Sequence, residues 1–137
     1  MKRSANATWR GGLGQGDGTF EVASGAFSNQ KFDFGTRFEK EPGTNPEELI
    51  AAAHASCFSM AFSAQLGELG ITPESVTTTA TITFEDAALS ESHLQSTVTA
   101  PGADKAKVKQ AAEAAKTGWP ISKVLNLGIT LELKIVA

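Results

Sequence analysis

The sequence predicts an α+β fold, and three observations support this prediction. Short strand patterns come first, one long apolar helix follows, and a hairpin, further helices and a final strand complete the chain. This order lacks the regular strand–helix alternation that builds a parallel sheet. A length of 137 residues is near the common size of one domain, so we expect residues 1–137 to form a single domain.

The composition is that of an ordinary globular protein, with 41% hydrophobic and 20% charged residues and a net charge of −3. The twelve Lys and Arg residues are scattered and outnumbered by fifteen acids, so we expect no nucleic-acid partner. No apolar stretch follows the N-terminus, and polar residues interrupt the run 49–66, so we expect no membrane span. The single cysteine fits a reducing compartment, and we expect a cytoplasmic location.

The first forty residues are typical of a meander of short strands. Apolar residues alternate at Phe20 and Val22, and less regularly at Phe32 and Phe34. We expect Arg37 to lie in the last of these strands, where a guanidinium group is either an exposed edge charge or the partner of an anion.

A helix start is signalled in GTNPEELI. Asn45 is suited to the N-cap, Pro46 to the first helical position, and Glu47 and Glu48 to the positive end of the helix dipole. We expect this helix to run to about Leu69. Apolar residues surround most of it, which predicts a partner subunit that covers its remaining side.

The second half of the chain begins with two Thr-rich segments, SVTTTATITFE and SHLQSTVTA, which predict a hairpin closed by EDAALSE. A helix is expected from about Ala103 to Lys116, and one further helical turn in PISKVLN. The last segment, LGITLELKIVA, alternates in strict period two and predicts a final strand.

Cys57 allows two interpretations. A free cysteine often behaves as a small buried hydrophobe. A reactive cysteine needs a group that stabilises the thiolate, and the helix start cannot supply it, because Cys57 lies roughly 16 Å along the axis from Pro46. His54, at position i−3, and Arg37 are the two candidate cations, and these residues alone do not decide between them.

Glu47 is explained by the helix dipole alone, but geometry constrains any further role. Glu47 and Cys57 are ten residues apart, hence about 15 Å along one helix and about 80° out of phase. If both belong to one site, they must come from two chains. No metal site is expected, because neither His54 nor His93 has further ligands at a suitable spacing.

The segment GTNPEELIAAAHASCFSMAFSAQLGELG, with FGTRFE before it and KTGWPISKVLNLGITLEL after it, resembles the OsmC/Ohr family, most closely its OsmC branch. The resemblance covers nearly the whole chain. It implies an intertwined homodimer in which antiparallel sheets wrap around long central helices, with two sites at the interface. It also implies reduction of organic hydroperoxides, with Cys57 as the peroxidatic cysteine and with Arg37 and Glu47 holding its thiolate.

The chain departs from the family pattern at one position. The family has a second, resolving cysteine in the motif G-C-P-[IV]-S, whereas this chain has Trp119 there. An indole cannot form a disulfide, so a sulfenic acid at Cys57 would need an external thiol or dithiol, and no cofactor is expected.

Three functions follow from this departure. The first is a one-cysteine peroxidase of oxidative and osmotic stress defence. The second is a non-catalytic or sensor module in which Trp119 lines an interface pocket for a hydrophobic ligand. The third is a structural descendant that keeps the dimer while its site is idle. Trp119 itself has a further interpretation, because a tryptophan at a turn before a proline often only packs on the core.

Overall fold

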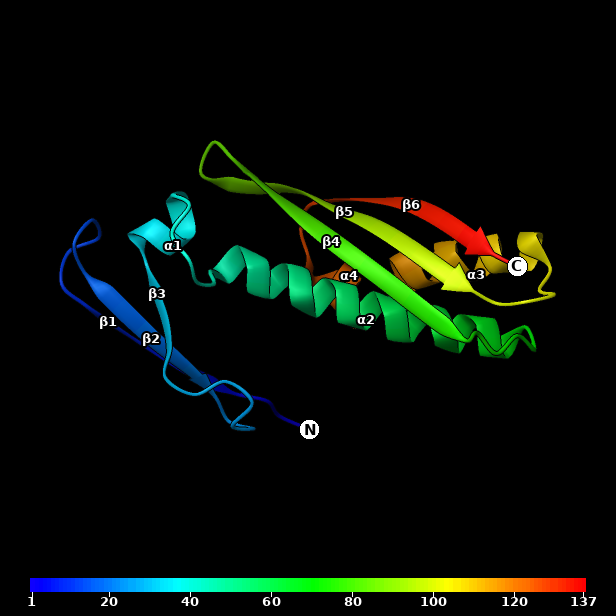
Figure 1. Cartoon of the computed structure of the whole chain (residues 1–137), viewed down its shortest axis with the longest axis horizontal. Coiled ribbons are helices and arrows are strands. Elements are labelled where there is room, and N and C mark those ends of the chain that lie inside the picture. The colour runs from blue at the N-terminus through cyan, green and yellow to red at the C-terminus, as the bar shows by residue number, and fades with distance from the viewer. The chain divides into compact units, whose positions relative to one another are not determined.

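The computed structural model describes residues 1–137 and has an α+β fold, as the sequence predicts. The chain divides into two compact units, Met1–Leu49 and Ile50–Ala137, which are described separately below. The prediction of a single domain stays a prediction. The helices and strands of both units are labelled in Figure 1.

The first unit contains a three-stranded antiparallel sheet in the order β1–β2–β3, which confirms the predicted meander. Its strands are β1 (Ala5–Arg10), β2 (Asp17–Val22) and β3 (Gln30–Asp33). Aromatic rings pack on one side of this sheet: the ring centroid of Phe32 lies 5.7 Å from that of Trp9 and 6.1 Å from that of Phe20. Gly18 leaves room for these rings, because a Cβ atom there would lie 2.6 Å from the Phe32 ring.

Arg37 lies on a helix, and the expectation that it belongs to a strand is wrong. Residues Phe34–Phe38 form a short helix, α1. Asp33 and Thr36 make a reciprocal capping box, in which the Thr36 N–H donates to Asp33 Oδ1 (2.8 Å) and the Asp33 N–H donates to Thr36 Oγ1 (3.0 Å). These local bonds start a helix at the point where the apolar alternation favoured an extended chain.

The long helix α2 (Pro46–Glu68) begins at the predicted residue and ends one residue before the expected Leu69. Asn45 is its N-cap, because the Glu48 N–H donates to Asn45 Oδ1 (2.8 Å). Gly70 ends the helix with a positive φ of 74°, and the Ile71 N–H donates to the Leu66 carbonyl (2.9 Å).

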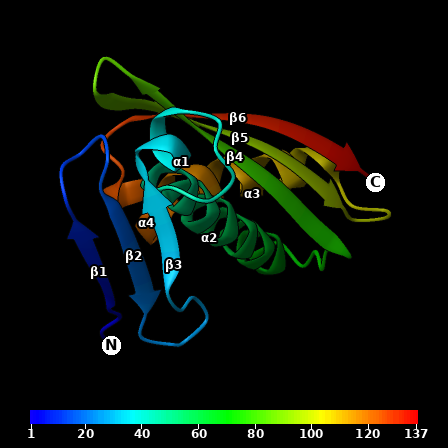
Figure 2. The same cartoon turned by 60° about the vertical axis from the view of Figure 1, so that its left-hand side comes forward.

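The second unit packs helices against one face of a second sheet, which has the order β4–β5–β6. Figure 2 shows α2 and α3 on the same side of that sheet. The elements that follow α2 are β4 (Ser75–Glu85), β5 (Ala88–Thr99), α3 (Lys105–Gly118), α4 (Pro120–Val124) and β6 (Gly128–Val136). The core draws on α2, β5 and α3; its buried members are Phe58, Ala61, Phe62, Leu66, Leu94, Val98, Ala100, Val108, Ala111, Ala112 and Ala115.

The sheet of the second unit differs from expectation at two points. β5 and β6 pair in parallel, whereas the resemblance to the OsmC/Ohr family implied antiparallel sheets. The pairing is parallel because α3 and α4 carry the chain back to the end of the sheet at which β5 starts. The hairpin turn is also shorter than EDAALSE. Only Asp86 and Ala87 lie outside the strands, both with positive φ (49° and 61°), as in a tight two-residue turn.

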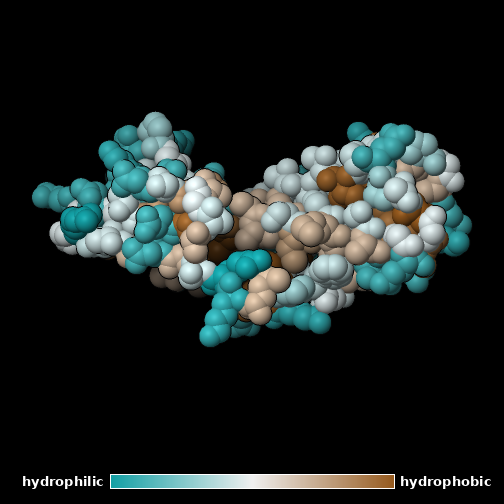
Figure 3. Space-filling view, turned by 90° about the horizontal axis from the view of Figure 1, so that it is seen from below, coloured by the Kyte–Doolittle hydropathy of each residue, from teal (hydrophilic) through white to brown (hydrophobic).

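By length and composition α2 could cross a membrane, and on these two criteria the expectation that its apolar run falls short is wrong. The core helix of a globular protein meets the same criteria. Figure 3, seen from below, shows apolar surface in tan and brown on the second unit. Met60 of α2 has 71% of its surface exposed. The covering partner subunit stays a prediction.

Candidate active site

Arg37 and Glu47 form an ion pair inside the first unit. The distance from Arg37 Nη2 to Glu47 Oε1 is 2.8 Å, and Arg37 Nε lies 3.2 Å and 3.3 Å from the two carboxylate oxygens. Two guanidinium nitrogens thus contact one carboxylate, which fixes the plane of both groups. The Arg37 side chain stays 38% exposed and that of Glu47 16%.

Asn45 holds the two elements that carry this pair. Its Oδ1 caps α2 by accepting from the Glu48 N–H, and its Nδ2 donates to the Thr36 carbonyl of α1 (3.0 Å). One amide side chain therefore ties α1 to the first turn of α2, so that Arg37 and Glu47 face each other. The sequence predicted the cap but not the second bond.

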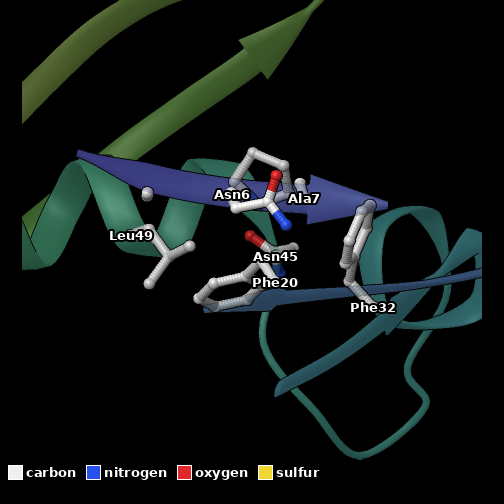
Figure 4. Close-up of a pocket in the computed structure, with 8 residues that line it drawn as sticks. Asn6, Ala7, Phe20, Phe32, Asn45 and Leu49 are labelled. Carbon is white, nitrogen blue, oxygen red and sulfur yellow. The ribbon is translucent and has the colours of Figure 1, made fainter. Parts of the chain in front are cut away.

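Two apolar cavities lie in the first unit, and they share Phe32. The cavity that Arg37 lines has a volume of about 260 Å³; its other lining residues are Trp9, Leu13, Phe32, Asp33, Phe34 and Phe38. The second, of about 280 Å³, lies between β1, the rings of Phe20 and Phe32, and the start of α2 at Asn45 and Leu49 (Figure 4). Both have mostly apolar walls, which suit an alkyl or aryl group.

Cys57 is a free thiol on α2 and is half-buried. Because α2 is one helix from Pro46 to Glu68, Cys57 lies about 15 Å along its axis from Glu47. A residue of α2 cannot bridge this distance to another residue of the same helix. The structure brings together Arg37 and Glu47 of one chain, and it does not bring Glu47 to the Cys57 of that chain.

His54 is completely buried and lies between two serine hydroxyls. Its Nδ1 is 2.7 Å from Ser92 Oγ on β5, and its Nε2 is 3.0 Å from Ser122 Oγ on α4. Burial lowers the pKa of His54 below the ordinary value of 6.5, so the imidazole is neutral at neutral pH. It therefore supplies no positive charge to a Cys57 thiolate, and Arg37 as the cation for that thiolate stays a prediction.

Trp119 lies between two helices, as the C-cap of α3 and the N-cap of α4. Its side chain is partly buried and packs against the hydrophobic core of the second unit. This packing agrees with the interpretation that Trp119 contributes to the core. The chain has no group of three or more His, Cys, Asp and Glu side chains that could hold a metal ion.

Sequence reasoning missed Ser92 and Ser122 as partners of His54. Ser122 stands in the predicted helical turn PISKVLN, and Ser92 stands in a predicted strand. Ser92 is separated from the core residues Leu94 and Val98 by even numbers of residues along β5, so it lies on the same face of the strand. The two-residue period of a strand could therefore have predicted that Ser92 points into the core.

The fold and the site define an α+β protein in which one long helix carries a lone thiol and begins at an arginine–glutamate pair. A family model described as OsmC-like protein matches residues 38–134. The chain is 45% identical over 139 residues to the peroxiredoxin OsmC of Escherichia coli (strain K12), with 98% of this chain and 97% of that protein covered. The chain therefore belongs to the OsmC-like family.

Two solved structures share the fold of this chain. The organic hydroperoxide resistance protein OhrB of Bacillus subtilis is 27% identical, with a TM-score of 0.66 over 96% of this chain and 98% of that one. An OsmC-like protein from Mycoplasma pneumoniae is only 16% identical, but its fold matches with a TM-score of 0.75 over 100% of this chain and 99% of that one.

Proposed function

We propose that this protein reduces organic hydroperoxides in defence against oxidative and osmotic stress, with Cys57 as its peroxidatic residue. The observation that carries the proposal is the 45% sequence identity, over nearly the full length, to a protein named peroxiredoxin OsmC. The position of the only thiol of the chain, on α2, supports it. The name of the OhrB protein, an organic hydroperoxide resistance protein, supports the same substrate class.

The reaction needs only thiol chemistry. The Cys57 thiolate attacks the distal oxygen of ROOH, the O–O bond breaks, and the leaving alkoxide takes up a proton to become ROH. Cys57 is thereby oxidised to sulfenic acid. One external thiol then displaces water to form a mixed disulfide, and a second thiol releases the Cys57 thiol together with an oxidised disulfide product.

Arg37 is the proposed cation for the thiolate, and Glu47 the residue that orients it. Because Arg37 is bonded to Glu47, and Glu47 cannot reach the Cys57 of its own helix, the ion pair of one chain would serve the Cys57 of a second chain. The active form is then a homodimer with two shared sites. Since Arg37 also lines an apolar cavity, we place the R group of the hydroperoxide there.

The reductant is proposed to be an external thiol or dithiol. Cys57 is the only cysteine of the chain, and the family position of the resolving cysteine holds Trp119. No cofactor takes part in this cycle, and a cytoplasmic location, where low-molecular-weight thiols are kept reduced, fits it.

The first test is the consumption of cumene hydroperoxide with an excess of dithiothreitol. Wild type and Ser56→Ala, a change in the exposed residue next to Cys57, should turn over, and Cys57→Ser should not. Equal turnover by wild type and Cys57→Ser would refute the proposal.

A mixing experiment tests whether the site is shared between chains. Arg37→Ala should lose activity by about 10²-fold or more, because it removes the charge that stabilises the thiolate. Refolding Cys57→Ser and Arg37→Ala chains together at equal amounts should restore about a quarter of wild-type activity, since half the dimers are mixed and each has one intact site. If each site belonged to one chain, mixing would restore nothing.

The second candidate function is binding of a hydrophobic ligand without turnover. The apolar cavity of about 280 Å³ next to Phe20 and Phe32 favours it. Trp9, which packs on Phe32, would report binding. A fatty acid should then shift Trp9 fluorescence saturably in a Trp119→Phe background while cumene hydroperoxide is left intact.

A further inference from the structure

The buried imidazole of His54 joins three elements of the second unit that are distant in sequence. Ser92 lies 38 residues and Ser122 lies 68 residues after His54, and both hydroxyls are within hydrogen-bond distance of a ring nitrogen. No part of the imidazole is exposed, and both serines are buried. Every buried side-chain nitrogen and oxygen in the protein has a partner, so this network is fully satisfied.

The contact to Ser122 connects two short turns that matter for the proposed chemistry. His54 precedes Cys57 by three residues on α2, which is one helical turn. Ser122 follows Trp119 by three residues, and the Lys123 N–H donates to the Trp119 carbonyl (3.1 Å) to close that turn. A single contact of 3.0 Å thus joins the turn of Cys57 to the turn of residue 119.

The turn that contains Ser122 needs such a contact. α4 has only five residues, and Trp119, its N-cap, makes no side-chain cap bond. An isolated helix of this length is unstable in water, so tertiary contacts must hold it in place. The hydrogen bond between His54 of α2 and Ser122 supplies such a contact. This bond is buried and directional, whereas hydrophobic packing is not directional.

We propose that His54 is a positioning residue, which fixes α4, and with it residue 119, against the Cys57 turn of α2 through Ser122. The role rests on the proposed peroxidase function: residue 119 stands where the family has its resolving group, so its position sets how an external thiol reaches oxidised Cys57. The Ser92 contact only anchors the other side of the ring to β5.

The two ring nitrogens can be tested separately. The amide of Asn occupies the place of Nδ1, and that of Gln the place of Nε2. His54→Asn therefore keeps the contact to Ser92 alone, and His54→Gln keeps the contact to Ser122 alone. Ser122→Ala and Ser92→Ala make the same distinction from the opposite side and form a matched pair, because each removes one hydroxyl from the same imidazole.

The experiment measures Trp119 fluorescence in a Trp9→Phe background, where Trp119 is the only tryptophan. Ser122→Ala and His54→Asn should shift the Trp119 emission to the red and increase its quenching by acrylamide. Ser92→Ala and His54→Gln should leave both close to the Trp9→Phe parent. Equal changes from Ser92→Ala and Ser122→Ala would overturn the proposal, because a merely structural histidine would respond equally to the loss of either partner.

A second measurement, with Trp9 intact, follows turnover. Ser122→Ala should change the KM for dithiothreitol and leave the rate of Cys57 oxidation by cumene hydroperoxide unchanged, whereas Ser92→Ala should change neither. An unchanged KM in Ser122→Ala would refute the link to resolution. If wild type showed no turnover, the proposed function would fail, and the fluorescence test of His54 would still be decisive.

Discussion

The two units of the chain hold their polar side chains in opposite ways. In the first unit, the bonds that place Arg37 and Glu47 join residues at most ten positions apart, and the arginine stays 38% exposed. In the second unit, His54 bonds to residues 38 and 68 positions away and has no exposed surface. The charged pair is thus built from local structure at an accessible surface, and the neutral network is built from the tertiary fold inside a core.

Core substitutions should give the largest difference in free energy of unfolding between the two units. Phe62 is completely buried in the core of the second unit, and Phe62→Ala should lower the free energy of unfolding by about 3–5 kcal/mol. Phe32 of the first unit is only partly buried, so Phe32→Ala should cost less. Urea unfolding followed by circular dichroism measures both. A larger loss from Phe32→Ala would reverse the comparison.

Substitutions of Asn45 test how much the bonds between residues close in sequence stabilise the first unit. Asn45→Ala removes the cap of α2 and the bond to the Thr36 carbonyl, and should lower the free energy of unfolding by about 1–2 kcal/mol. Asn45→Asp keeps the capping oxygen and loses the donor to Thr36, so its loss should be smaller. Urea unfolding of the three proteins gives this order. Equal losses for both variants would mean that the cap contributes nothing.

The pH dependence of stability tests the second unit. Burial lowers the pKa of His54 in the folded state, so below the unfolded value of 6.5 the unfolded chain binds more protons at this residue. The contribution of neutral His54 is complete above pH 6.5 and is lost as the pH falls from 6.5 toward the folded pKa. Urea unfolding of wild type and His54→Gln from neutral to mildly acidic pH should show this loss in wild type only. If His54→Gln lost the same stability as the pH falls, titratable groups other than His54 would be its cause.

The smallest expected effect concerns the turn between β4 and β5. Ala87 has a positive φ, which costs an L-residue energy that glycine avoids, so Ala87→Gly should raise the free energy of unfolding by roughly 0.5–1 kcal/mol. Ala88→Gly, one residue further and inside β5, should lower it by a similar amount. Thermal unfolding of the two variants should give melting temperatures on opposite sides of wild type.

The same contrast explains how much the sequence could predict. The start of α2 was predictable, because Asn45, Pro46 and Glu47 carry the signal within three neighbouring positions. The position of Cys57 and its distance from Glu47 followed from helix geometry. Arg37 was placed on a strand, because the capping box of Asp33 and Thr36 overrides the apolar alternation around it.

Long-range features were not predictable. No local pattern links His54 to Ser92 and Ser122, since their contact depends on where β5 and α4 lie in the folded unit. The direction of β6 relative to β5 was missed for the same reason. Strict alternation in LGITLELKIVA predicts a strand with one buried face, and it is equally compatible with parallel and antiparallel pairing.

The parallel pairing of β5 and β6 has a consequence for the order of folding. The β4–β5 hairpin closes through a two-residue turn, and isolated hairpins form within about 1–10 μs. The pairing of β6 joins residues such as His93 and Thr130, which are 37 positions apart, and the intervening chain must first be brought back along the sheet. Because loop closure must precede the contacts that reward it, we expect β6 to add last, in a slower step than the hairpin.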